Sequence, residues 1–379
     1  MPVTLLQEIA VFVLGTTSYL HQASSYDARI IPIMKSWGGD LQHLYFVFGA
    51  SRRDNAFMIN RGCALSHTLD SASADSVEDK SAIEKYGCPI YSGEISNVRR
   101  KEVSILRFMS CSSGYFGPGP TCRCEESLRY FQHYLENLRW FIFQDDDVYL
   151  RPIPLQQMLS CVSQNTAAPV AIVSAKFTRG LYFSKEWDRI DNKMCSYYQF
   201  PYAQPAILNF EAVRALDSLV KCNGLSRLRN KWRGTHDHLL GLALWLYNIP
   251  VYSLAKIYFT DELYHATNIT SNVMLRSQDK AKVSTLNRYI VFHRLRNWSV
   301  TDSKTNTTKR TIGHLELYDY LNDTSSHKNI LTSLGEESFK VLFRIKSTSL
   351  SNMNSSNKDL ESKIRNIRYD FFDFSVDYC

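Results

Sequence analysis

The sequence predicts an α/β protein built around a parallel sheet. Short apolar runs of strand length recur along the chain, a helical pattern lies between two of them, and the run at 140–143 passes straight into three carboxylates, Asp145, Asp146 and Asp147. Four apolar residues in succession suit a strand that is covered on both faces, as in a parallel sheet. The acidic triplet therefore falls at the carboxyl end of a strand, the edge where such sheets bind ligands.

The remaining elements follow in chain order. We predict strands at 9–14, 44–48 and 169–173, and a helix over 26–37 that is imperfect around Pro32. Residues 51–110 are polar and receive no assignment, and the Gly/Pro-rich stretch 114–120 predicts a loop. Cys124, Leu128, Phe131 and Leu135 recur at helical spacing and predict an amphipathic helix before the 140–143 strand.

Length and charge limit the function classes. A chain of 379 residues allows two average domains, or one α/β domain of roughly 250 residues with appendages. The chain becomes polar near residue 300, and 347–357 is typical of a Ser/Asn-rich linker, so we predict a folded domain over 8–299 and a polar extension over 300–379. The net charge of +7 contains no long basic block, which argues against a nucleic-acid partner. The sequence contains neither a GxGxxG nor a P-loop motif.

Cysteines and sequons favour an oxidising compartment. The nine cysteines fit neither zinc-ribbon nor CxxC spacing, so disulfides are expected, with one thiol left free, for which Cys379 is the candidate. Five N-x-S/T sequons agree with a luminal or secreted setting. The early apolar run 9–14 is too short to span a bilayer and follows Glu8, so we expect export to use another signal or an amino terminus beyond this sequence.

The acidic triplet is a candidate metal site. Adjacent carboxylates repel one another and are costly to desolvate, so a counter-charge is expected. Mg²⁺ or Mn²⁺ binds through one or two carboxylates while phosphates of a substrate fill more of its shell. Asp145 and Asp147 share one face of an extended chain and are the candidate ligands, which leaves Asp146 on the other face. The alternative is an acidic turn that only ends the strand.

Two further residues complete the candidate site. Asp237 lies in the first turn of a predicted buried helix, where it is either a cap or the general base that takes a proton from an attacking hydroxyl. His293 follows an apolar strand at 289–292 and is followed by Arg294. This histidine is either structural or a neutral imidazole that completes the shell of Mn²⁺.

The order of these motifs resembles the fringe and core 1 β1,3-galactosyltransferase superfamily of luminal glycosyltransferases. The resemblance covers about residues 8–296. It implies the GT-A fold, a Rossmann-like mixed sheet with helices on both faces. It is carried by the acidic triplet with Val148 and Tyr149, by Asp237 and Gly241, by Phe292 and His293, and by Thr16, Thr17, His21, Arg29 and Trp37 near the amino terminus.

The resemblance implies a role for each site residue. Asp145 and Asp147 match the family's DxD motif, where Mn²⁺ bridges the diphosphate of a UDP-sugar, and Asp146 lies with them in the donor site. His293 matches a late metal-binding histidine, and Asp237 matches the catalytic base. The metal would stabilise the leaving UDP while Asp237 activates the acceptor hydroxyl for inverting attack at the anomeric carbon.

Two departures from the family pattern bear on activity. His236 stands where the family has the first acid of an acidic pair, so acceptor recognition is expected to differ. The stretch 202–209 stands where the family has a Gly-Gly-Ala-Gly loop that lines the sugar site. Replacing glycines removes the space for a close backbone approach and makes positive φ costly, so donor specificity or activity itself is expected to be affected.

The function implied is transfer of galactose or an N-acetylhexosamine from a UDP-sugar to a glycan or glycoprotein, in a β1,3 linkage, in the Golgi or ER lumen or after secretion. Homodimer formation is left open. One alternative is a non-catalytic glycan-binding or chaperone-like relative, in which nucleotide binding is weak or absent. Another is a metal-assisted hydrolase that uses the same carboxylates and forms product without an acceptor.

Overall fold

A computed structural model describes most of the predicted folded domain. The main described ranges are 6–15, 30–50, 102–112, 117–165, 168–174, 203–233, 235–247, 249–254, 289–295 and 307–323. Shorter described segments lie at 88–89, 177–178, 182–183, 200–201, 258–259, 264–266, 299–302 and 341–343, with the single residues 114 and 286. Thr16, Thr17, His21, Arg29, Tyr202 and Cys379 fall outside these ranges.

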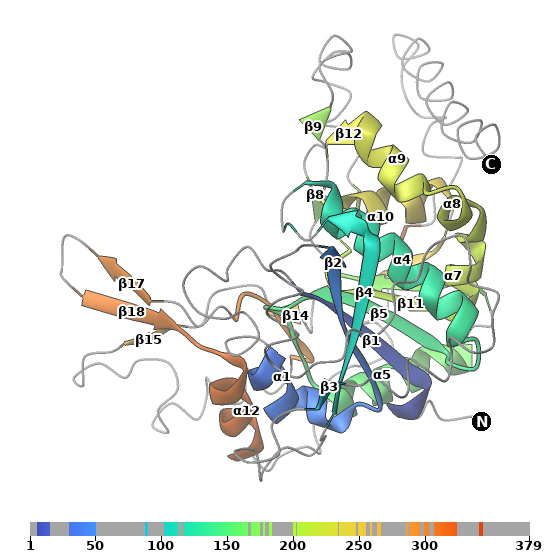
Figure 1. The fold of residues 1–379 in the computed structure, drawn as a ribbon. Helices are drawn as coiled ribbons and strands as arrows, with labels where there is room; N and C mark the ends of the chain where they lie inside the picture. The colour runs from blue at the N-terminus through green and yellow to red at the C-terminus, as the bar shows by residue number, and fades with distance from the viewer. Residues whose placement is uncertain are drawn as a thin grey trace, which may run out of the picture.

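A mixed sheet forms the centre of the molecule. Within the described residues its strand order is β19-β13-β7-β11-β5-β1-β2-β4-β3 (Figure 1). The central strands β5, β1, β2 and β4 run parallel, whereas β11 runs antiparallel between β5 and β7. The strands are β1 Ile9–Leu14, β2 His43–Ala50, β3 Cys88–Pro89, β4 Glu102–Ser112, β5 Trp140–Asp145, β7 Ala171–Val173, β11 Ala206–Asn209, β13 Val251–Ser253 and β19 Val341–Phe343.

Helices cover both faces of this sheet (Figure 1). One face packs on α1 Ile31–Lys35, α5 Pro152–Asn165 and α12 His314–Asp323. The other packs on α4 Pro118–Tyr134, α7 Phe210–Ala215, α8 Asp217–Lys221, α9 Gly224–Lys231 and α10 His236–Leu246. All six residues of β1 are buried, and alternate ones enter opposite apolar clusters. The predicted α/β class, with a mixed sheet and helices on both faces, is confirmed.

Smaller sheets surround this core. A three-stranded sheet of β6 Tyr149–Leu150, β16 Val291–Phe292 and β14 Tyr258–Phe259 lies next to the carboxyl end of β5. Another, of β15 Tyr264–Ala266, β18 Thr307–Thr311 and β17 Ser299–Asp302, projects away from the main body (Figure 1). Two short pairs join β8 Phe177–Thr178 to β10 Phe200–Pro201 and β9 Tyr182–Phe183 to β12 Trp232–Arg233. The 3₁₀ turns are Leu6–Glu8 and Trp37–Asp40.

The structure corrects three local predictions. The segment 102–112, left unassigned, forms the eleven-residue strand β4. The predicted loop 114–120 ends early, because α4 begins at Pro118 with prolines in its first turn, where a missing N–H removes no helical hydrogen bond. The helix predicted over 26–37 ends at Lys35 rather than Trp37, and residues 26–29 lie outside the described ranges. The strands predicted at 9–14, 44–48 and 140–143 are confirmed, and the one predicted at 169–173 is present as the shorter β7, which begins at Ala171.

Cysteine pairing agrees with the expected disulfides. Cys111 at the end of β4 is bonded to Cys122 in α4, and Cys222 is also disulfide-bonded. Among the described cysteines the free one is Cys124, which is buried. In the described part of the chain, no helix has the length and apolar character needed to cross a membrane.

The segment after residue 300 contributes to the main apolar core. Ile312, Leu317 and Leu321 are buried in the same cluster as α1 and α5. The predicted domain boundary at 299/300 stays a prediction, but α12 packs with the central sheet rather than apart from it.

Candidate active site

The acidic triplet lies at the carboxyl end of β5, as predicted. Asp145 is the last residue of that strand and pairs with Leu14 of β1. The chain then turns, with the Val148 N–H donating to the Asp145 carbonyl at 3.3 Å and the Gln144 side-chain amide donating to the Val148 carbonyl at 3.1 Å. All three aspartates are buried, with exposures of 4–6%. Buried, closely spaced carboxylates require a compensating positive charge.

Strand pairing brings His293 to Asp147 across 146 positions of sequence. β6 follows the acidic turn and pairs with β16, which His293 directly follows. The Leu295 N–H donates to the Asp147 carbonyl at 3.0 Å, and His293 Nε2 lies 3.3 Å from Asp147 Oδ1. These are two of the predicted metal-binding side chains, and they face each other.

Tyr258 orients the His293 ring. Its hydroxyl lies 2.8 Å from His293 Nδ1. Burial raises the pKa of Tyr258, and the nearby charges of Asp147 and Asp145 raise it further, so the hydroxyl stays protonated. A hydrogen bond at Nδ1 fixes the ring and directs Nε2 towards Asp147. Sequence reasoning did not identify Tyr258, because it lies in an apolar stretch that reads as core.

His236 connects the acidic turn to α10. Its Nε2 lies 3.4 Å from Asp145 Oδ1, and its ring packs edge-on against Phe143, with centroids 5.3 Å apart. Burial lowers the pKa of His236 to about 4, with a smaller lowering from the Arg123 charge, although Asp237 acts in the opposite direction. The imidazole is therefore neutral at pH 7, and its contact with Asp145 is not an ion pair there.

Asp237 lies in the first turn of α10, as predicted. Its Oδ1 accepts from the His238 N–H at 2.8 Å, from His238 Nδ1 at 2.9 Å and from the Thr235 hydroxyl. Burial alone would raise the pKa of Asp237, but these hydrogen bonds and the neighbouring imidazoles outweigh it and hold the pKa far below its usual range. The side chain is an ionised carboxylate. Among the described residues, its hydrogen bonds all reach Oδ1.

A buried chain of hydrogen bonds holds the acidic turn on the side of the sheet that packs on α1, α5 and α12. The Trp37 indole N–H donates to His314 Nδ1 at 3.2 Å, and His314 Nε2–H donates to the Asp146 carbonyl at 2.9 Å. His314 is 1% exposed and stacks on Tyr149. Sequence reasoning assigned this histidine to a polar extension, because nothing local marks it as a core residue.

Of the three predicted metal ligands, Asp147 and His293 face each other, whereas Asp145 does not face them. Within the described residues, no group of three or more His, Cys, Asp or Glu side chains is arranged to hold a metal ion. Asp147 and His293 form a facing O/N pair, while Asp145 faces His236 instead. Mg²⁺ and Mn²⁺ accept one or two protein ligands when substrate phosphates supply others, and the Asp147–His293 pair meets that requirement.

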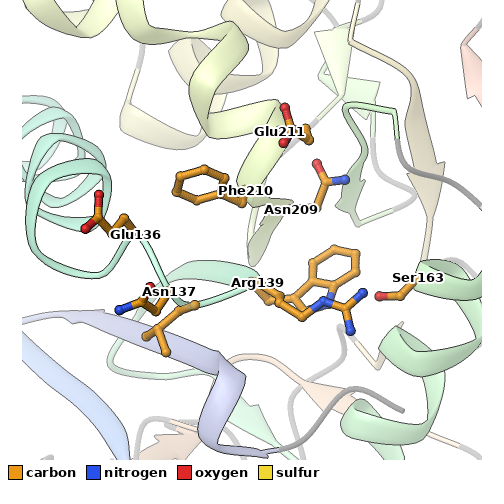
Figure 2. Close-up of a pocket in the computed structure, with 9 residues that line it drawn as sticks. Glu136, Asn137, Arg139, Ser163, Asn209, Phe210 and Glu211 are labelled. Carbon is orange, nitrogen blue, oxygen red and sulfur yellow. The ribbon is translucent and has the colours of Figure 1, made fainter. Parts of the chain in front are cut away.

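A separate pocket lies at the other end of β5 (Figure 2). It has a volume of about 320 Å³, and its lining includes Glu136, Arg139, Trp140, Asn209 and Phe210. Trp140 begins β5 and Asp145 ends it, so this pocket is at the opposite edge of the sheet from the carboxylates. The Asn209 side chain is engaged as the cap of α7 and by the 168–170 backbone. This pocket is not part of the predicted site.

Comparisons with known proteins found neither a matching family model nor a matching curated protein. Among solved structures, a glycosyltransferase involved in glycosylation of the major capsid of PBCV-1 matches at 12% identity and TM-score 0.30, covering 66% of this chain and 92% of its own. The WbbM bifunctional glycosyltransferase matches at 10% identity and TM-score 0.38, covering 88% of this chain and 52% of its own.

A third match is 4-diphosphocytidyl-2C-methyl-D-erythritol synthase from Anaerococcus prevotii, at 8% identity and TM-score 0.33, covering 74% of this chain and 95% of its own. These three proteins do not share one activity by name, and at such scores the likeness does not assign a function.

Proposed function

We propose that this chain is a metal-dependent, inverting glycosyltransferase of the GT-A type. It would transfer galactose or an N-acetylhexosamine from a UDP-sugar to a glycan or glycoprotein, in a β1,3 linkage. One observation carries the proposal: the Asp147–His293 pair and the ionised carboxylate of Asp237 lie at the same edge of the sheet. The two are linked through Asp145 and His236, whose facing atoms are 3.4 Å apart.

In this proposal each side chain has a distinct task. Asp147 and His293 would hold Mn²⁺, with Asp145 and Asp146 beside them in the donor site and Tyr258 fixing the imidazole. When bound, the ion would neutralise charge that develops on the departing diphosphate. Asp237 would accept the proton of the acceptor hydroxyl, and the alignment of its hydrogen bonds on Oδ1 supports a role for the other oxygen.

The setting proposed is the Golgi or ER lumen, or the secreted state. The Cys111–Cys122 disulfide and the bonded Cys222 support an oxidising compartment. The UDP-sugar and a glycan or glycoprotein acceptor are the partners that follow from the chemistry.

A non-catalytic glycan-binding protein is the second candidate, and one observation favours it. The three donors on Asp237 Oδ1 hold its pKa so low that it is a weaker base than a carboxylate tuned for proton transfer. That arrangement also fits a helix cap that only stabilises the start of α10.

Calorimetric titration with UDP separates the two candidates. We expect UDP to bind in the presence of Mn²⁺ and to lose that binding in EDTA or in Asp147→Ala. Asp217→Ala, which removes an exposed carboxylate paired with Lys221 in α8, is the matched control and should bind as the wild type does. A folded wild-type protein that binds no UDP would favour the non-catalytic candidate.

Turnover tests the base. Asp237→Asn is expected to keep UDP affinity within about twofold and to lose roughly 10²–10⁴-fold in sugar transfer, the usual contribution of a general base. Normal transfer by Asp237→Asn would show the base assignment to be wrong. Release of sugar from the donor without any acceptor would point to a hydrolase instead.

A further inference from the structure

His238 is paired with the carboxylate of Asp237 at the start of α10. Its Nδ1 lies 2.9 Å from Asp237 Oδ1, and its backbone N–H donates to the same oxygen at 2.8 Å. The exposed Thr235 contacts both side chains through its hydroxyl. The three side chains therefore form one hydrogen-bonded group. This group lies next to the acidic turn, because His236 in the same helix turn is 3.4 Å from Asp145.

The two members of the pair differ in exposure. The His238 side chain is 26% exposed, whereas the Asp237 side chain is 5% exposed. A base must come within hydrogen-bond distance of the hydroxyl from which it takes a proton. An acceptor hydroxyl that approaches from solvent therefore has the imidazole within reach, while most of the carboxylate lies beneath other protein atoms.

The carboxylate determines which ring nitrogen of His238 carries the hydrogen. Burial opposes the charge of Asp237, but the hydrogen bonds from His238 and Thr235 and the neighbouring imidazoles hold its pKa far below the usual range, so it is ionised. A lone pair on Nδ1 would be repelled by an anionic oxygen at 2.9 Å, whereas Nδ1–H donates to that oxygen. The neutral ring therefore carries its hydrogen on Nδ1 and its basic lone pair on Nε2.

We propose that His238 takes the proton of the acceptor hydroxyl on Nε2, and that Asp237 orients its ring. This inference rests on the proposed function and changes one step of it, the destination of the proton. The acceptor oxygen bonds to the anomeric carbon as the bond from that carbon to UDP breaks. The hydroxyl proton then passes to Nε2, and the electron pair of the broken bond leaves with UDP. A strongly acidic carboxylate is a poor proton acceptor, but it stabilises an adjacent imidazolium well.

His238→Gln separates the two assignments of the base. The glutamine amide can still donate to Asp237 Oδ1 but has no basic nitrogen. We expect this variant to keep UDP affinity within about twofold and to lose roughly 10²–10⁴-fold in sugar transfer from UDP-galactose or UDP-N-acetylglucosamine, whichever the wild type uses. His133→Gln, at an exposed histidine in α4, is the matched control and should transfer sugar as the wild type does.

Nuclear magnetic resonance of ¹⁵N-labelled protein tests the pair without any substrate. At about pH 8, where an imidazole is neutral, we expect the His238 ring as the Nδ1–H tautomer. The signal that is missing from His238→Gln identifies this residue. In Asp237→Asn the anionic partner is lost, so the ring should shift towards the Nε2–H tautomer.

The outcomes are distinguishable. Normal transfer by His238→Gln, or an Nε2–H tautomer in the wild type, would overturn the role of His238 and leave Asp237 as the base. Lost transfer that added imidazole partly restores in His238→Ala would show that the missing group is the base and not a structural support. Failure of the wild type to bind UDP, or to transfer sugar from either donor, would overturn the proposed function and this assignment with it.

Discussion

Arg294 adopts a backbone conformation that its residue type disfavours. Its φ is 70°, in the left-handed region, where a residue with a Cβ is destabilised by about 1–2 kcal/mol. The backbone on both sides is held by hydrogen bonds, since the His293 N–H donates to the Phe259 carbonyl and the Leu295 N–H donates to the Asp147 carbonyl. The Arg294 charge lowers the pKa of Tyr258 in opposition to burial, so the guanidinium acts on the candidate metal site. Strain of this kind is typical of functional positions.

The residue-scale prediction concerns this strain. Arg294→Gly is expected to raise the free energy of unfolding by about 1 kcal/mol, because glycine adopts positive φ without a Cβ clash. It should also weaken Mn²⁺-dependent UDP binding roughly tenfold, because a cation close enough to act on Tyr258 of the candidate metal site is lost. Chemical denaturation and calorimetry measure the two effects.

The control for Arg294→Gly is Asn223→Gly. Asn223 lies before α9 and is the other non-glycine residue with positive φ in the described part of the chain, with φ at 54°. It should leave UDP affinity unchanged. If Arg294→Gly also bound UDP normally, the guanidinium would have no part in the donor site.

The residues of the candidate site could be predicted from the sequence, whereas the residues that hold them in position could not. Asp145, Asp147 and Asp237 stand next to apolar runs that mark strand and helix ends, so their position at one sheet edge follows from the pattern. Tyr258 and His314 contact the site only through pairing and packing between distant segments, which no local pattern records. Gln204 falls in the stretch 202–209, which the sequence marks only by its missing glycines; that its buried amide has no hydrogen-bond partner among the described residues is a property of the folded chain.

At the scale of elements, Glu125 links α4 to the start of α9. Its carboxylate accepts from the Leu225 N–H at 2.9 Å, the Ser226 N–H at 3.3 Å and the Ser226 hydroxyl at 2.7 Å. Burial nevertheless raises the pKa of Glu125 from 4.5 to about 7, against the lowering effect of those hydrogen bonds. The folded protein therefore holds this proton over a pH range in which the unfolded chain releases it.

The element-scale prediction follows from the direction of that shift. Because the folded pKa is raised, the stability that Glu125 contributes is complete below pH 4.5 and is lost as pH rises through about 7. The loss amounts to about 3 kcal/mol by pH 8. Denaturation of wild type and Glu125→Gln between pH 4.5 and 8 should show a smaller decline in the variant.

Ser226→Ala provides an opposed control. It removes a hydrogen bond that favours the charged form of Glu125, so the decline in stability should extend to higher pH. Parallel pH profiles for wild type and Glu125→Gln would contradict the assignment.

The differences between predicted and observed elements have physical causes. The runs in β1 and β5 are buried on both faces, so their continuous apolar sequence identified them. In contrast, β4 mixes charged, hydroxyl and apolar residues, with Leu106 and Phe108 buried but Ser110 exposed. It forms because β2 supplies a parallel partner along its length, a tertiary effect that single-sequence propensity does not contain.

At the scale of the whole molecule, the segment after residue 300 supports the site. His314 donates to the Asp146 carbonyl and accepts from Trp37, and so connects α12, the start of the 3₁₀ turn Trp37–Asp40 and the acidic turn. Ile312, Leu317 and Leu321 are buried with the residues of α1 and α5. At about 1.5–3 kcal/mol for each fully buried aliphatic side chain, exposing these three to water would cost an amount comparable to the 5–15 kcal/mol net stability of a typical domain.

The last prediction is that the predicted domain 8–299 does not fold stably by itself. A chain cut after residue 299 loses the buried face of α12. It also leaves the Trp37 N–H and the Asp146 carbonyl without their His314 partner, which destabilises the folded state by about 1–3 kcal/mol for each group. We expect it to unfold at lower denaturant concentration or to aggregate. A chain cut after residue 346, before the predicted linker at 347–357, is the control and should retain folding and UDP binding.

A point variant separates the two contributions of this segment. His314→Phe keeps the aromatic stacking on Tyr149 but removes both hydrogen bonds, whereas His314→Gln can keep a donor for Asp146 and an acceptor for Trp37. His314→Phe should therefore weaken Mn²⁺-dependent UDP binding about tenfold, and His314→Gln should restore part of it. If the chain ending at residue 299 folded and bound UDP as the full chain does, α12 would be an appendage and the boundary at 299/300 would be a true domain boundary.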